Sequence, residues 1–389
     1  MSHPYRPDDA TRRHLETATH ACRGTLTAHA AQVDAQARFP RESLAELARA
    51  GLLGLCVPVD RGGAGAGMRA FATVTEELAT ACGSTAMIYV MHVVAAQAIA
   101  SSATLATRDR LLAEIAAGRH LTTLAFSERG SRSQFWAPVS RLESGPDGYR
   151  VRARKSWVTS AAHADSYVSS AQRPGAGSPL ESTVYLVRRD APGVRRATGF
   201  DGLGLRGNDS MPVEFEDLAV AEGDLISAQG DGATTMLQVV LPWFAIGTAA
   251  MSNGLCRAAV DVTLGHLAAT TFDHTATALR DLPNLRARVA EMSVRTEQAR
   301  ALLGHALDHL ETGSATAPLA VLQTRLASMQ AAWDVTDLAM KTCGGAAFSK
   351  HLGLERVFRD ARAGWVMAPT VDHLLEFSGR ALTGMPLFA

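Results

Sequence analysis

The feature that most constrains this 389-residue chain is the order in which its hydrophobic periodicity changes. Apolar residues follow helical spacing over residues 1–120 and again over 232–389, whereas residues 121–231 hold short alternating runs typical of strands. We therefore expect an α+β protein of three domains. These are an N-terminal α-helical domain (1–120), a middle antiparallel β-barrel or sandwich domain (121–231) and a C-terminal α-helical bundle domain (232–389).

Long helices are expected on both sides of the β segment. Residues Ser84 to Ala100 are almost all apolar or small, which predicts a helix buried over most of its circumference. The C-terminal part carries apolar stripes at i, i+3 and i+4, which predict a four-helix bundle. The expected helices there are Met236 to Leu267, Leu285 to Leu310, Ala317 to Cys343 and Leu374 to Leu382.

Composition excludes several classes of partner. Lys+Arg and Asp+Glu balance at 38 each, so no net charge attracts nucleic acid or an anionic membrane. The five cysteines are scattered without CxxC spacing, which argues against a disulfide framework or a metal site and favours the cytoplasm. The N-terminal residues lack signal-peptide character, and no run of about 18 consecutive apolar residues occurs. We expect a cytoplasmic protein with no membrane partner and no metal.

Five motifs occur along nearly the whole chain in the order and spacing of one family. They are Leu52-Leu53-Gly54-Leu55-Cys56-Val57-Pro58 with Gly62-Gly63-Ala64-Gly65; Leu124-Ala125-Phe126-Ser127-Glu128-Arg129-Gly130; Lys155-Ser156-Trp157-Val158-Thr159-Ser160; Leu203-Gly204-Leu205-Arg206-Gly207 with Val213-Glu214-Phe215-Glu216-Asp217; and Gly344-Gly345 with Arg359-Asp360-Ala361-Arg362. Each is weak alone, but together they resemble the acyl-CoA dehydrogenases. The resemblance implies the helix–sheet–helix architecture, an FAD cofactor and a homo-oligomer, either dimer or tetramer.

The resemblance also implies which residues contact the flavin. The Ser127 hydroxyl is expected at the polar edge of the isoalloxazine ring, Trp157 against its dimethylbenzene end and Thr159 near N5, on the same strand face as Trp157. Ser133 would donate to the pyrophosphate, after Arg132 where the family has glycine. The other implied contacts are Phe126, Lys341, Gly344, Gly345, Thr370 and Asp372. Alternatively, Trp157 is a core aromatic, Thr159 fills a strand, and the glycine pair ends a helix.

The segment Val366-Met367-Ala368-Pro369-Thr370 resembles the family's catalytic segment but lacks its base. The glutamate that removes the substrate α-proton in the family is Ala368 here, and alanine cannot accept a proton. Some members keep the base on a bundle helix instead, where this chain has Phe244. Asp372 or Glu376 are the alternatives for a displaced base.

Two further departures concern the cofactor and the cavity. The segment Phe272 to Ala276 lacks the arginine and Phe-Gly pair that reach a partner subunit's flavin in the family. This suggests a flavin held differently or more loosely, such as FMN or an exchangeable reduced flavin. His92 lies in an apolar helix, where it is either a hydrogen-bonded core residue or a catalytic group facing the cavity. His163 and His373 are weaker candidates.

Three functions remain open from these residues. The first is an oxidoreductase that acts on an acyl thioester, CoA- or carrier-protein-linked, by hydride transfer to flavin N5 with a non-standard or absent base. The second is a reduced-flavin-dependent two-component monooxygenase on a small organic substrate. The third is a non-catalytic flavin- or acyl-binding protein. The redox partner would be an electron-transfer flavoprotein or a flavin reductase.

Overall fold

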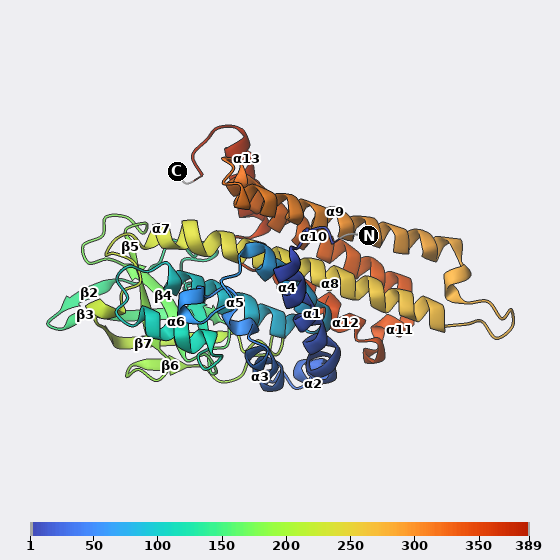
Figure 1. Ribbon diagram of the computed structural model, residues 1–389, viewed down its shortest axis with the longest axis horizontal. Helices are drawn as coiled ribbons and strands as arrows, with labels where there is room; N and C mark the ends of the chain where they lie inside the picture. Colours follow the sequence, from blue (N-terminus) through green and yellow to red (C-terminus); the bar gives the residue numbers. More distant parts are fainter. Residues whose placement is uncertain (1–2, 388–389) are drawn as a thin grey trace.

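A computed structural model of the chain describes residues 3–387. The strands lie at one end of the longest axis and a long helical bundle extends toward the other, with α4 (Met68–Ala81) and α5 (Gly83–Ala100) between them (Figure 1). The expected order of helices, strands and helices is confirmed, as is the α+β class.

The N-terminal part is helical, and α5 is its most buried element. The other helices are α1 (Asp9–Ala21), α2 (Thr27–Ala35), α3 (Arg41–Arg49) and α6 (Arg108–Ala116), with a π-helical segment η1 (Cys22–Leu26) joining α1 to α2. Every residue of α5 is buried except Gln97 and Ala100, which are half-buried. This burial follows from its neighbours, because α5 contacts α4, the first strand and the first long bundle helix. A helix that is covered on all sides has no solvent-exposed face, which explains why almost all residues of α5 are apolar or small.

The middle part forms two sheets packed as a sandwich. The first has the order β1-β4-β5, with β1 (Thr122–Ala125), β4 (Ser166–Gln172) and β5 (Ser182–Arg188). The second has the order β2-β3-β7-β6, with β2 (Leu142–Gly145), β3 (Gly148–Val158), β7 (Met211–Val220) and β6 (Val194–Arg196). Residues of both sheets, including Tyr167, Tyr185, Val213 and Phe215, share one buried cluster. The strands pair antiparallel as expected, except that β1 and β4 run parallel.

Three long helices run side by side in the C-terminal part (Figure 1). They are α8 (Leu241–Ala269), which continues from α7 (Gly232–Thr234) and the π-helical η5 (Thr235–Val240), α9 (Pro283–Glu311) and α10 (Ala317–Cys343). The short helices α11 (Gly345–Phe348), α12 (Leu354–Ala361) and α13 (Val371–Leu382) follow. Helix α10 has the predicted bounds, and Gly344 ends it with a positive φ of 56°.

Two helical stretches are long and apolar enough to cross a membrane by length and composition alone. They are α5 and residues Gly232–Ala269, whose most apolar windows are 89% and 72% buried inside the protein. The prediction concerned unbroken runs of about 18 apolar residues, and polar residues such as His92 and Asn253 interrupt both stretches. Core helices pass the same test, and burial within the fold accounts for the composition of both stretches.

A buried ion pair joins β3 to the segment after β1. Lys155 Nζ lies 2.5 Å from Glu128 Oε1 and donates to the Ser170 carbonyl at 2.6 Å, while Glu128 Oε2 accepts from the Val139 and Ser140 amides at 2.6 and 2.8 Å. Burial alone would raise the pKa of Glu128, but the Lys155 charge and these hydrogen bonds hold it below its ordinary value. The pair therefore fixes the backbone that carries the neighbouring Ser127 and Trp157.

Replacing Lys155 by methionine should destabilise the protein strongly, because the Glu128 carboxylate stays buried without its cation. We expect a loss of about 3–5 kcal/mol in the free energy of unfolding, measured by urea denaturation. The matched control is Lys341→Met, since Lys341 pairs with Asp337 at 2.6 Å but is 65% exposed. That change should cost less than about 1 kcal/mol. Equal losses in the two variants would contradict the role given to the buried pair.

Candidate active site

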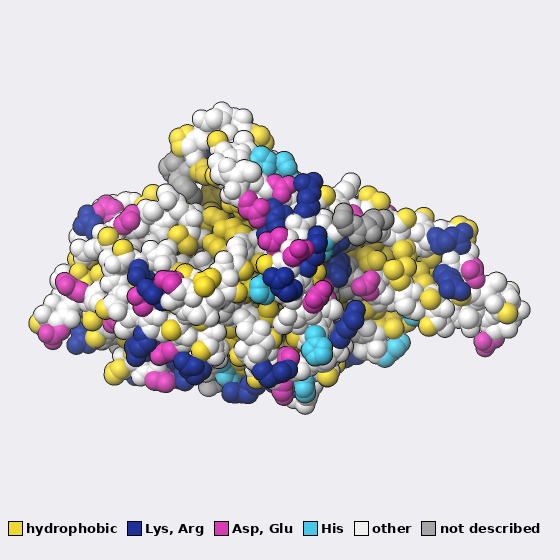
Figure 2. All heavy atoms as spheres, in the orientation of Figure 1, with side chains coloured by type: hydrophobic (Ala, Val, Ile, Leu, Met, Phe, Trp, Pro, Cys, Tyr) yellow, Lys and Arg dark blue, Asp and Glu magenta, His cyan; other side chains and the backbone are white. Residues whose placement is uncertain are grey.

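The segments that carry the predicted site residues meet where the sheets join the bundle. Phe126, at the end of β1, stacks on Phe135 with ring centroids 6.3 Å apart. Trp136 follows and lies 6.0 Å from the His373 ring and 5.5 Å from the Phe377 ring, both on α13. Figure 2 shows hydrophobic side chains gathered in a hollow beneath α13, on its side toward the sheets. The loop after β1 and α13 therefore enclose one apolar region.

Trp157 is not a core residue. Its side chain is 70% exposed and its φ is +55°, at a register shift of β3 between Lys155 and Val158. Thr159 is buried and lies beyond the end of β3. Because β3 is irregular here and ends at Val158, Trp157 and Thr159 do not lie on one continuous strand as expected, and their exposures differ. An indole held in the left-handed region and exposed to solvent is a platform on which a planar ligand can stack.

Two half-buried hydroxyls in the loop after β1 have no protein partner. Ser127 and Ser133 form no side-chain hydrogen bond with any other residue in 3–387. Arg132 has a φ of +50°, so the loop keeps the left-handed conformation for which glycine is the usual residue. The hydroxyls are therefore available as donors to the polar atoms and phosphate oxygens of a ligand.

The structure divides the implied contacts of the C-terminal part into two groups. Thr370 lies at the start of α13 with its Oγ1 2.9 Å from His373 Nδ1, and Asp372, two residues further along, is exposed. Lys341, Gly344 and Gly345 lie beside α11, at the end of the bundle away from the sheets (Figure 1). The two groups therefore do not line one pocket within a single chain.

Both positions at which the family places its acid lie beside a cation here. Ala368 is half-buried, and the carbonyl of the preceding Met367 accepts from Arg325 Nη2 at 3.1 Å. The Arg325 guanidinium carbon also lies 4.9 Å from the ring centre of Phe244. Arg325 was missed in the sequence although its signal is visible: it occupies the apolar stripe of α10 midway between Val321 and Met329, at i+4 spacing from each.

The carboxylates considered as displaced bases lie on the outer face of α13. Asp372 and Glu376 are exposed, and Glu376 pairs with Arg380 at 3.3 Å. The opposite face of the helix, with Leu374 and Phe377, packs into the core. The helix would have to rotate to bring either acid inward, so neither replaces the missing glutamate in this conformation.

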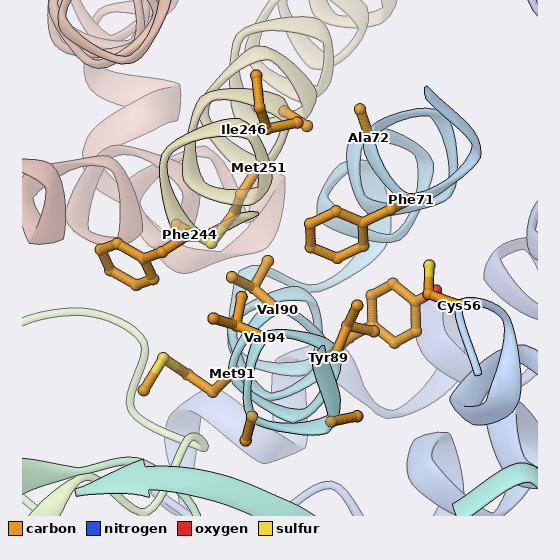
Figure 3. Packing of buried hydrophobic residues seen from close by; sticks show 14 of the residues in the cluster. Cys56, Phe71, Ala72, Tyr89, Val90, Met91, Val94, Phe244, Ile246 and Met251 are labelled. Atoms are coloured by element: carbon orange, nitrogen blue, oxygen red, sulfur yellow. The ribbon is translucent and has the colours of Figure 1, made fainter. Parts of the chain in front are cut away.

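His92 is a core histidine with both ring nitrogens in use. Its Nε2 lies 3.1 Å from the Leu53 carbonyl and its Nδ1 accepts from the Thr122 amide at 3.2 Å. Burial lowers its pKa to about 4, so the ring is neutral at physiological pH. The preceding residue, Met91, is the one directed to the same side of the core as Phe244 (Figure 3). His92 is therefore the hydrogen-bonded core residue of the two alternatives.

Family models match all three parts of the chain. The N-terminal, middle and C-terminal domains of acyl-CoA dehydrogenase match residues 8–119, 123–218 and 230–382. The chain belongs to the acyl-CoA dehydrogenase superfamily. It is therefore an acyl-CoA dehydrogenase-like flavoprotein of the FAD-dependent oxidoreductase class, and FAD is its cofactor.

Similar proteins cover almost the whole chain. Cyclohex-1-ene-1-carbonyl-CoA dehydrogenase of Geobacter metallireducens is 26% identical over 360 residues, which are 92% of this chain and 93% of the relative. Butyryl-CoA dehydrogenase from Megasphaera elsdenii superposes with a TM-score of 0.91 at 21% identity, over 97% of this chain and 99% of that one. The FAD complex of PigA superposes with a TM-score of 0.89 at 20% identity, over 97% and 98%.

Removing the exposed indole should weaken FAD binding without unfolding the protein. Loss of an aromatic stacking face costs about 0.5–1.5 kcal/mol, so Trp157→Ala should raise the Kd for FAD by about two- to tenfold. The measurement is titration of FAD into apo-protein, followed by flavin fluorescence. Leu203→Ala is the control, because Leu203 is similarly exposed at 66%. An unchanged Kd in Trp157→Ala would remove the stacking role.

His92 should make the protein less stable in acid. In the unfolded chain His92 is protonated below about pH 6.5, whereas in the folded protein its pKa of about 4 keeps the ring neutral down to that pH. The free energy of unfolding therefore decreases as the pH falls from 6.5 to about 4. The shift corresponds to about 3 kcal/mol. The free energy of unfolding, measured by urea denaturation at pH 7.5 and 4.5, should decrease less between these pH values in His92→Gln than in the wild type. The exposed His20, changed to glutamine, should leave the pH dependence unaltered.

Proposed function

We propose that this flavoprotein oxidises an acyl thioester, linked to CoA or to a carrier protein, without a carboxylate base. The similarity to cyclohex-1-ene-1-carbonyl-CoA dehydrogenase over nearly the full length of both chains supports a thioester substrate. The observation that carries the proposal is the presence of an exposed ligand platform at Trp157 together with an apolar region enclosed by α13, the helix that follows Ala368.

The residues around the platform fit FAD. Trp157 offers a flat exposed face, and the free hydroxyls of Ser127 and Ser133 suit the polar edge of the ring and the pyrophosphate. Phe126 and Thr159 adjoin them in the chain. FAD bound there supplies a hydride acceptor, and the protein's part is to hold the ring, exclude water and place the substrate against it.

Oxidation at the β-carbon also requires a group that takes the α-proton. Ala368 cannot, and we assign this role to His373, whose half-buried imidazole lies beside Thr370 and against Trp136. If Nδ1–H donates to Thr370 Oγ1, Nε2 is left as a proton acceptor, and it has no hydrogen-bond partner among the described residues. Imidazole is the side chain best suited to proton transfer near neutral pH.

The test is anaerobic mixing of the flavoprotein with saturated acyl-CoA thioesters of several chain lengths, with flavin bleaching as the readout. His373→Gln should slow bleaching by about 10²–10⁴-fold, the usual contribution of a general base. Adding Ala368→Glu to that variant should restore part of the rate, whereas the isosteric Ala368→Gln should not. Absence of bleaching by every thioester would end the proposal, and an undiminished rate in His373→Gln would end the assignment of the base.

A two-component monooxygenase acting on a small organic substrate is the second candidate. It needs no α-proton acceptor, which suits Ala368, and it uses reduced flavin from a reductase. The exposed turn that contains Phe272 to Ala276 lacks the family's flavin-contacting arginine, which suits a flavin that exchanges. Incorporation of labelled oxygen from O₂ into a product would favour this candidate. A protein that binds flavin and shows neither reaction would be a non-catalytic flavin- or acyl-binding member.

We also propose a cytoplasmic homo-oligomer in which α11 faces the flavin of a second copy. Lys341, Gly344 and Gly345 lie beside α11, at the end of the bundle away from the sheets (Figure 1), and the neighbouring Phe348 is 88% exposed. A large exposed aromatic next to open glycines suits a subunit contact. The electron acceptor would be an electron-transfer flavoprotein for the dehydrogenase and a reductase would be the donor for the monooxygenase.

A further inference from the structure

Arg325 is a fully buried arginine whose hydrogen-bonding capacity is largely unused. Its side chain has 0% exposure in the middle of α10. Nη2 donates to the Met367 carbonyl at 3.1 Å, but Nε and Nη1 are buried without a hydrogen-bond partner in residues 3–387. Arg325 also forms no ion pair within that part of the chain.

Two half-buried arginines of this protein are neutralised by carboxylates, whereas the buried Arg362 lies over the rings of Phe358 and Trp365. Arg359 donates to both Asp34 oxygens at 2.9 and 2.6 Å, and Arg300 lies 2.9 Å from the buried Glu76. Burying an unpaired charge costs several kcal/mol, which is why such pairing is the rule. Burial lowers the pKa of Arg325 to about 9, so the guanidinium is still protonated at pH 7. The Arg325 guanidinium is therefore a buried cation that an anion would stabilise.

Apolar side chains and a second unpaired polar group surround Arg325. The guanidinium lies over the Phe244 ring, and its hydrogen bond to the Met367 carbonyl joins it to the segment that precedes Ala368. Ser328, one turn further along α10, has another buried hydroxyl without a partner. Met91 and Phe244 point to the same side from α5 and α8 and offer apolar walls for methylene groups (Figure 3).

We propose that Arg325 binds an anionic group on the acyl part of the substrate, so that the preferred substrate is a thioester of a short dicarboxylic acid. This rests on the proposed function for the identity of the ligand as a thioester. A carboxylate neutralises the buried cation and accepts charge-assisted hydrogen bonds from its free nitrogens, whereas a neutral acyl chain leaves the charge unpaired. The guanidinium thus selects the substrate at the place where relatives carry the catalytic acid.

Binding without turnover tests the proposal on the purified full-length flavoprotein. The probes are succinyl-, glutaryl- and adipyl-CoA, each compared with the thioester in which the free carboxylate is replaced by its neutral amide. Dissociation constants come from calorimetry at pH 7. Wild type should bind the best carboxylate about tenfold or more tightly than its amide. In Arg325→Gln the dissociation constants of the carboxylate thioester and its amide should agree within about twofold, since both ligands then contact a neutral side chain.

The control variant is Arg295→Gln, because Arg295 pairs with Asp334 on the bundle surface and is 41% exposed. This variant should prefer the carboxylate over the amide as strongly as the wild type does. Arg325→Lys keeps the charge and should keep part of the preference, which covers the case in which Arg325→Gln does not fold. A wild type without preference at all three lengths overturns the proposal, as does a preference retained in Arg325→Gln. Because binding is measured and flavin reduction is not, failure of this proposal is distinguishable from failure of the proposed thioester oxidation, which flavin bleaching tests.

Discussion

The ion pair between Glu128 and Lys155 is the constraint on which the geometry of the site depends. It lies inside the middle domain and connects β3 to the loop that leaves β1. One partner is adjacent to Ser127 and the other is two residues before Trp157, so the same buried charges fix both sides of the proposed flavin platform. A buried pair tolerates little displacement, because each ion is stabilised by the other and by hydrogen bonds from the surrounding backbone and, for Glu128, from the Ser140 hydroxyl.

A reversal of charge distinguishes this site from the family pattern. The positions where an acid is expected hold Ala368 and Phe244, and the guanidinium of Arg325 lies between the two segments. A cation there cannot accept a proton, but it can bind an anion. Proton transfer and recognition of the substrate's anionic group therefore fall to different side chains. Proton acceptance is assigned to the imidazole of His373 on α13, and recognition is assigned to α10.

Much of the fold could be predicted from the sequence, whereas the site could be predicted only in part. Helix α10 has the predicted ends because an amphipathic stripe and a glycine stop are local signals. The parallel pairing of β1 with β4 depends on contacts between strands far apart in the chain, so no local pattern could reveal it. His92 shows the same limit: only the fold brings the Leu53 carbonyl and Thr122 amide to its two nitrogens.

The sequence by itself determined the domain order, the family and the absence of a glutamate at position 368, since each is carried by residue type and spacing along the chain. Only the tertiary structure decided that Trp157 is exposed and that Arg325 is buried with no carboxylate partner among residues 3–387. Exposure and pairing are properties of what surrounds a side chain, and those surroundings come from segments more than forty residues away, such as Met367 beside Arg325.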